Sequence, residues 1–121
     1  MGVELTAVQA LNLWRSAIVD SVRRDGPDLS ARQMALMLTV YVTPPPHTVR
    51  GLAVTLNISK PAVTRALDRL SEFGLIKRKV DEADRRSVLV QRTVKGSVFL
   101  REFGDLVVAA TREATGEAVA G

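Results

Sequence analysis

Side chains that donate hydrogen bonds recur at helical spacing in the middle of the chain, at Lys60, Thr64 and Arg65. A helix brings residues about four positions apart onto one face, so these three share a surface. Ammonium, hydroxyl and guanidinium groups bind phosphate oxygens and the acceptor atoms on base edges. A helix presented in this way can lie in the major groove of DNA. The alternative is the solvated, charged face that any surface helix carries.

A second group of charged side chains, Asp84, Arg85 and Arg86, lies at the expected tip of a hairpin. Strands are predicted over residues 75–80 and 87–91, the second rich in β-branched and apolar side chains. The two arginines are candidates for contact with a DNA groove or with phosphate. Asp84 is a candidate to position Arg86, because a carboxylate can orient a guanidinium through a charge-assisted hydrogen bond. The alternative is a solvated loop.

The helix that carries the first group is expected to begin after Ser59 and to end at Gly74. Ser59 is a good N-cap, and Pro61 falls in the first turn, where its missing amide hydrogen costs nothing. Gly74 can adopt the left-handed conformation that the position after a helix needs. The residues expected to face the core follow helical spacing and are Val63, Ala66, Leu67, Leu70 and Phe73.

A shorter helix is expected just before this one, with Thr48 as its N-cap. Asn57, Ile58 and Ser59 form the turn between the two helices, and Ile58 is expected to fill the core between them. Two short helices joined by about three residues match the helix-turn-helix pattern. The inward residues of the shorter helix are predicted to be Val49, Leu52, Ala53 and Leu56.

The distribution of charge favours a polyanionic partner. At 121 residues, of which 46% are hydrophobic, the chain can form one small domain with a single core. Its net charge is +4. Residues 60–101 hold 11 Lys and Arg against 5 Asp and Glu, whereas the rest of the chain holds 6 against 8. The positive charge is therefore concentrated where the DNA contact is expected, which favours steering toward phosphate.

The segment over residues 52–96 resembles the winged helix of the MarR family of bacterial transcriptional regulators. The matching motifs are the spacing from the predicted helix through Gly74-Leu75-Ile76 and Arg78, the wing tip Asp84-Arg85-Arg86, and the closing Thr93-Val94-Lys95-Gly96. The resemblance implies a homodimer on a pseudo-palindromic operator, with the helix at 60–73 in the major groove and Arg86 in the minor groove. Many relatives are repressors released by small aromatic or phenolic ligands, so a small-molecule effector is implied as well.

The chain departs from this family in three ways. Arg92 stands where an apolar residue, usually leucine, precedes the threonine of the closing motif, which predicts a more exposed end of the second strand. The chain is shorter than most relatives. Pro44, Pro45 and Pro46 form an unusual connector, which either holds an extended, stiff segment or simply stops a helix.

The flanking regions are predicted to be helices with apolar faces. One spans residues 4–24, a second runs from the N-cap Ser30 to residue 42 with Met34, Leu38 and Tyr41 on one side, and a long helix follows the N-cap Thr93. The winged helix has its own core, so the first and last helices are expected to bury their faces against a second copy of the chain. The alternative is that both fold back on their own domain. The candidates for the dimer interface are Leu11, Trp14, Ile18, Phe103, Leu106 and Val107.

Catalytic and metal-binding roles find little support. The single histidine, His47, has no cysteine partner and no acidic neighbour in the sequence. General acid–base catalysis would need a group that orients the imidazole, and a metal site would need further ligands. It is predicted to be a turn residue, the alternative being a place in the lining of a ligand pocket. The absence of cysteine excludes a disulfide and a thiol switch in this chain. We expect no enzymatic activity, no cofactor and no metal; with no signal peptide and no run of transmembrane length, we expect no membrane association and a cytoplasmic location.

The predicted fold is mainly α with a small β-hairpin: a single domain over residues 1–121, with N-terminal helices at 1–43, a winged helix-turn-helix at 48–92 and a C-terminal dimerisation helix at 93–115. The predicted function is sequence-specific binding of double-stranded DNA by a homodimeric transcriptional regulator that acts as a repressor. The alternative is a winged-helix module that binds an acidic protein and has no specific DNA site. The candidate DNA-binding residues are Ser59, Lys60, Pro61, Thr64, Arg65, Arg69, Lys77, Asp84, Arg85 and Arg86.

Overall fold

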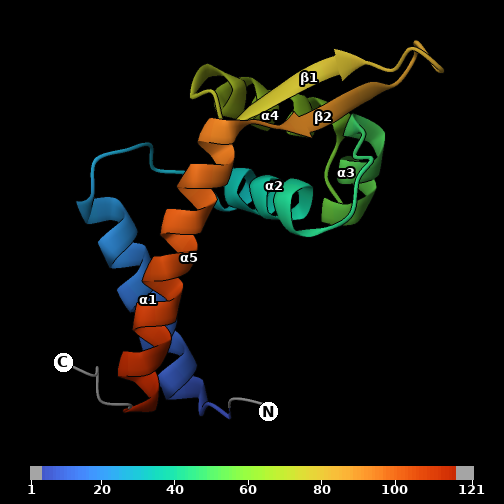
Figure 1. Ribbon diagram of the computed structural model, residues 1–121. Coiled ribbons are helices and arrows are strands. Elements are labelled where there is room, and N and C mark those ends of the chain that lie inside the picture. Colours follow the sequence, from blue (N-terminus) through green and yellow to red (C-terminus); the bar gives the residue numbers. More distant parts are fainter. Residues whose placement is uncertain (1–3, 117–121) are drawn as a thin grey trace. The chain divides into compact units, whose positions relative to one another are not determined.

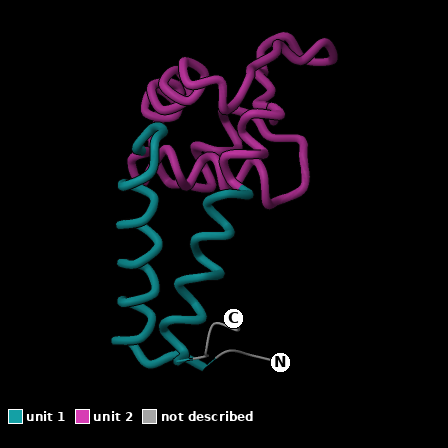
Figure 2. Tube along the Cα trace, turned by 60° about the vertical axis from the view of Figure 1, so that its left-hand side comes forward, with its two compact units in different colours: residues 1–28, 101–121 teal, residues 29–100 magenta. Residues whose placement is uncertain are grey.

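The computed structural model describes residues 4–116, which are mainly helical and include a two-stranded antiparallel hairpin (Figure 1). The elements are α1 (Ala7–Arg23), α2 (Ala31–Val42), α3 (Val49–Leu56), α4 (Lys60–Glu72), β1 (Ile76–Val80), β2 (Val88–Arg92) and α5 (Val94–Thr115). They fall into two compact units: residues 29–100 form one, and the segments before and after them form the other (Figure 2). The predicted fold class is confirmed.

Side chains at the helix ends determine where α3 and α4 begin and where the turn between them lies. The Thr48 hydroxyl accepts a hydrogen bond from the Gly51 amide at 2.9 Å, and the Ser59 hydroxyl accepts one from the Ala62 amide at 3.2 Å. Each hydroxyl satisfies an amide that has no acceptor inside its own helix. Asn57 closes α3 in the left-handed conformation, at φ 54°, which asparagine tolerates better than most residues. Both predicted N-caps are confirmed.

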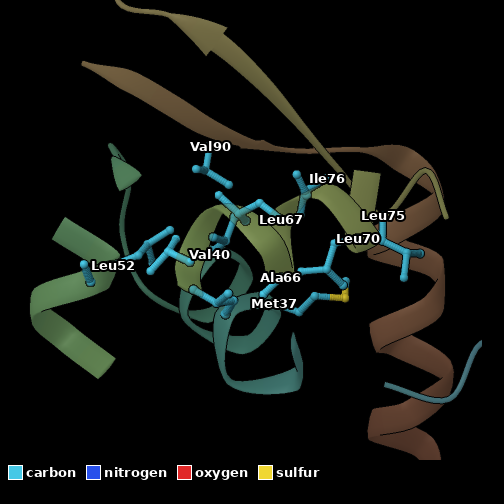
Figure 3. Packing of buried hydrophobic residues seen from close by; sticks show 12 residues of the cluster. Met37, Val40, Leu52, Ala66, Leu67, Leu70, Leu75, Ile76 and Val90 are labelled. Carbon is cyan, nitrogen blue, oxygen red and sulfur yellow. The ribbon is translucent and has the colours of Figure 1, made fainter. Parts of the chain in front are cut away.

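The core of residues 29–100 lies where α2, α3, α4 and the hairpin meet (Figure 3). On α4 the side chains of Val63, Leu67 and Leu70 are fully buried. Phe73 at the end of this helix is half-buried and packs against the same core. Gly74 follows at φ +75° and ends the helix as predicted. The inward face predicted for α4 is confirmed, and the opposite face of the helix is exposed to solvent.

The buried face of α2 differs from the prediction. Leu36 and Met37 are fully buried and Val40 is nearly so, whereas Leu38, which we placed with Met34 and Tyr41 on one apolar side, is exposed. The helix is apolar around most of its circumference, so hydrophobic spacing alone does not determine which side meets the core.

The two strands and their connecting residues 81–87, together called the wing, pair with Ile76 opposite Arg92 and Val80 opposite Val88. Each strand begins one residue later than predicted. The tip of the wing extends beyond α3 and α4 (Figure 1). The chain that leads into α3 adds to the other edge of β2, where the Val90 amide donates to the His47 carbonyl at 2.8 Å. This bond ties the wing to the start of α3.

Hydrogen bonds around one tyrosine join α2 to both ends of the wing. The Tyr41 hydroxyl donates to the Leu75 carbonyl just before β1 and accepts from the Thr93 amide just after β2, at 2.9 Å. Gly96, in the first turn of α5, is buried beneath this hydroxyl. A Cβ at position 96 would overlap both the Tyr41 hydroxyl and the Leu75 carbonyl. Only glycine therefore fits at this position of the closing motif without a shift of its neighbours.

Arg92 is exposed at the end of β2, as its departure from the family pattern predicts. Its guanidinium donates through Nε to the Val40 carbonyl at 3.0 Å and through one terminal nitrogen to the Thr43 carbonyl at 3.2 Å. These carbonyls lie at the C-terminal end of α2, where a cation is favourable. Arg92 therefore caps α2.

In the second unit, α1 and residues 101–115 of α5 lie side by side (Figure 1). The rings of Trp14 and Phe103 meet edge to face at 6.2 Å between centroids. The Ser16 hydroxyl donates to the Glu113 carboxylate at 3.0 Å. The helix α1 begins at Ala7, after the N-cap Thr6, rather than at residue 4 as predicted. Among the described residues, no helix combines the length and the apolar character that crossing a membrane requires.

Candidate nucleic-acid interface

The exposed face of α4 collects the predicted contact residues of the helix-turn-helix. This face is exposed because the apolar positions of the same helix turn toward the core. Ser59 is exposed just before the helix. The predicted residues that are exposed on the helix itself are Lys60, Pro61, Thr64, Arg65 and Arg69.

Ion pairs divide the cations of α4 into two groups. Arg69 donates to the Glu72 carboxylate at 2.8 Å, and its guanidinium carbon lies 4.6 Å from the centre of the Phe73 ring. Arg69 is thus held at the C-terminal end of the helix. Within residues 4–116, neither Lys60 nor Arg65 forms an ion pair or a side-chain hydrogen bond. The N-terminal half of the exposed face therefore carries uncompensated positive charge.

The second acidic residue on this face is neutralised by the wing. Asp68 forms an ion pair with Arg78 of β1, at 2.8 Å between the carboxylate oxygen and the guanidinium nitrogen. Neighbouring residues of a strand point to opposite faces, so Lys77, which is exposed, points away from α4. The structure therefore does not bring Lys77 together with the predicted contact residues of α4.

The tip of the wing has the arrangement predicted for Asp84 and Arg86. One oxygen of the Asp84 carboxylate accepts from the backbone amide of Arg86 at 3.1 Å and from its Nε at 3.4 Å. The other oxygen accepts from the Ser87 hydroxyl at 3.3 Å. The Arg86 side chain stays 91% exposed, so its guanidinium is oriented without being covered. Arg85 lies 3.6 Å from Glu82 and is also exposed.

A cavity of about 240 Å³, called the basic cavity here, brings Lys60 and Thr64 of the first predicted group beside Arg86 of the second. Its wall comes from the first turn of α3, the N-terminal half of α4 and the wing. Arg50, in the first turn of α3, was missed by the sequence analysis, because a lone cation in a short apolar helix resembles an ordinary solvated side chain. The lining residues are Thr48, Val49, Arg50, Lys60, Thr64, Arg86, Ser87 and Val88.

His47 lies in the connection between α2 and α3, where its carbonyl pairs with β2, and it lines a separate cavity of about 280 Å³, which was the alternative to the predicted turn. Its Nε2 lies 3.1 Å from the Thr43 carbonyl, which leaves the ring held at the end of α2. The rest of this cavity is formed by Val40, Pro45, Pro46, Leu89, Val90, Gln91 and Arg92. In the part of the chain that the structure describes, no group of three or more acidic or histidine side chains could hold a metal ion.

The residues predicted for a dimer interface lie in the unit formed by α1 and the end of α5. Leu11 is 70% exposed, and Trp14 and Ile18 are also exposed, so these three are available to a second chain. Phe103 is only 4% exposed, because it already packs against Trp14 within one chain. Its burial needs no partner. Leu106 and Val107 are half-buried.

Comparison with known proteins gives one family. The sequence model of the MarR family matches residues 29–88, which include α2, α3, α4, β1 and the start of β2. The transcriptional repressor CouR, bound to a 23-mer DNA duplex, is 26% identical, with a TM-score of 0.69 over 91% of this chain and 75% of that one. The regulator BldR from Sulfolobus solfataricus is also 26% identical, with a TM-score of 0.63 over 93% and 84%.

The wild-type MarR of E. coli in its apo form is 24% identical and has a TM-score of 0.67, covering 93% of this chain and 82% of that protein. These structures share the order of helices and the hairpin described above. The family match and the common fold lead to the same result: the chain belongs to the MarR family and has its winged helix-turn-helix fold.

Proposed function

We propose that the protein is a transcriptional regulator that binds double-stranded DNA at specific sequences, as a homodimeric repressor on a pseudo-palindromic operator. The observation that carries the proposal is the basic cavity, where cations from α3, α4 and the wing meet. Beside it lies the exposed face of α4, whose N-terminal half forms no ion pair with any residue that the structure describes. CouR, which resembles this chain over most of its length, is a repressor bound to a DNA duplex. That likeness supports both DNA as the partner and repression as the outcome.

The proposed contacts follow the position of each element. The N-terminal half of a recognition helix meets base edges, so Pro61, Thr64 and Arg65 are assigned to the major groove. Arg86 on the wing is assigned to the minor groove, which narrows in A-tracts and then attracts arginine. Among the remaining predicted residues, Asp84 orients Arg86. The others fix the position of the protein on the sugar-phosphate backbone, without reading sequence. They are Ser59, Lys60, Arg69, Lys77 and Arg85.

A homodimer is part of the proposal because one helix reads too few base pairs to define a site. Two copies related by a two-fold axis read half-sites about 34–36 Å apart, which is one turn of DNA. The exposed side chains of Leu11, Trp14 and Ile18 on α1 support a second copy at that surface. Release of the DNA by a small-molecule effector completes the proposal and is supported by the family alone.

A salt titration separates this function from binding to an acidic protein. Affinity for duplex DNA of random sequence is expected to fall linearly with salt on logarithmic axes, with a slope of about −0.9 for each phosphate neutralised. A duplex enriched from a random pool is expected to bind much more tightly than the random duplex at the same salt concentration. Failure to bind any duplex at low salt would contradict the proposal and favour the acidic protein partner.

A further inference from the structure

We infer that the basic cavity binds one phosphate group of the DNA backbone, and that Arg50 clamps this phosphate and so fixes the position of the protein along the DNA. The inference rests on the proposed function and adds a site and a residue to it. A clamp of this kind would act on every duplex alike, because phosphates carry no sequence information of their own.

Three cations from three different elements line the cavity: Arg50 of α3, Lys60 of α4 and Arg86 of the wing. None of the described lining residues is acidic. Within the described range 4–116, neither Arg50 nor Lys60 has a hydrogen-bonding or ionic side-chain partner. The acidic partner of Arg86 is Asp84 on its own loop, at 3.4 Å. A concave surface of one charge concentrates the electric field, so an anion is attracted to it more strongly than to a convex one.

Neutral donors complete the wall of the cavity. The hydroxyls of Thr48 and Thr64 line it beside the cations. The Thr48 hydroxyl accepts a bond from the Gly51 amide, which leaves its hydrogen to donate to another acceptor. The first turns of α3 and α4 add the positive ends of two helix dipoles. An oxyanion is the ligand that matches a wall of cations and donors.

Arginine suits a clamp better than lysine does. Its planar guanidinium presents two parallel donors to two phosphate oxygens, whereas the ammonium of lysine acts as a single point of charge. Arg50 stands on α3, and the residues assigned to base edges stand on α4. The clamp is therefore separate from sequence reading and holds α4 at one depth and one position along the groove.

The test compares Arg50→Ala and Arg50→Lys with the parent and with the control Arg32→Ala. Arg32 is the matched control because it is exposed and is the second residue of α2, as Arg50 is the second residue of α3, and it lines neither described cavity near the wing. Circular dichroism and thermal unfolding of all four proteins establish that each is folded before binding is measured.

Affinity is measured on an operator selected from random duplexes and on derivatives in which one phosphate at a time is replaced by a neutral methylphosphonate. Arg50→Ala is expected to weaken binding about tenfold or more for each half-site, to lower the salt slope by about 1 and to select the same consensus as the parent. Neutralising the clamped phosphate in each half-site is expected to weaken DNA binding by the parent strongly and DNA binding by Arg50→Ala hardly at all. Arg50→Lys is expected to keep the salt slope of the parent and to lose part of this phosphate-specific effect.

Each other outcome overturns a stated part of the account. If Arg50→Ala binds the operator as tightly as the parent, the clamp is wrong while the proposed function stands. The same holds if neutralising each phosphate in turn weakens binding by Arg50→Ala as much as it weakens binding by the parent. If Arg50→Ala selects a different consensus, Arg50 contacts bases and the assignment to phosphate is wrong. If the parent itself binds no duplex, both the clamp and the proposed function are wrong.

Discussion

Replacing Gly96 with alanine is expected to destabilise the protein, even though alanine is the better helix former. The new Cβ would overlap the Tyr41 hydroxyl and the Leu75 carbonyl. If the tyrosine moves aside, the bond from the Thr93 amide at 2.9 Å and the bond to the Leu75 carbonyl are both lost. Two backbone groups are then left without partners, at about 1–3 kcal/mol each.

Alanine recovers about 1 kcal/mol of helix propensity over glycine, so the net loss for Gly96→Ala is about 3 kcal/mol. For a chain of this size such a loss lowers the unfolding midpoint by roughly 10–15 °C. The measurement is thermal unfolding followed by far-UV circular dichroism, with all proteins at one concentration because dimerisation raises apparent stability.

Gly104 provides the matched control, since it lies in the same helix and an added Cβ would meet nothing within 4 Å among the described atoms. Gly104→Ala is expected to leave the midpoint unchanged or to raise it slightly. A Gly96→Ala protein as stable as the parent would refute the assignment of the tyrosine as the link between α2 and the wing. Equal losses for both variants would show that the effect comes from the helix in general.

Arg86→Ala is expected to weaken operator binding by about 1–3 kcal/mol in a gel-shift series, and Asp84→Ala by less, because it frees the guanidinium without removing it; unchanged affinity for both would remove the wing from the interface. Arg65→Ala is expected to change the consensus recovered by selection, and recovery of the parent consensus would reduce Arg65 to a phosphate contact. Leu11→Asp is expected to give a folded monomer by light scattering, since the side chain is 70% exposed within one chain and burying a leucine contributes about 1.5–3 kcal/mol. A Leu11→Asp protein that remains dimeric would place the interface elsewhere.

Much of the winged helix was predictable because local signals agree there. The caps Thr48 and Ser59, the terminating Gly74 and the spacing of Val63 and Leu67 all indicate the same two helices. Each of these signals depends on residues a few positions apart, and such local chemistry can be read from the sequence.

The sequence was least informative where it leaves several arrangements equally good. Apolar residues lie around most of α2, so the sequence does not show whether Leu36 or Leu38 faces the core. Phe103 has the pattern of an interface residue, yet Trp14 covers it within one chain, because two apolar helices of the same protomer meet there. Such choices depend on packing between segments far apart in the sequence.

Arg50 was missed for a related reason. Nothing near it in the sequence sets it apart, and it joins the basic cavity only when folding places the first turn of α3 beside Lys60 and Arg86. The bond between Val90 and His47 that ties the wing to α3 joins residues more than forty positions apart. A long-range arrangement of this kind requires the structure.

Selection of duplexes from a random pool by the purified protein tests the central claim most directly. A homodimer with one recognition helix in each half-site is expected to enrich an inverted repeat whose half-sites have centres about 10–10.5 base pairs apart. Recovery of unrelated sequences, or of a single half-site with no symmetric partner, would contradict the account.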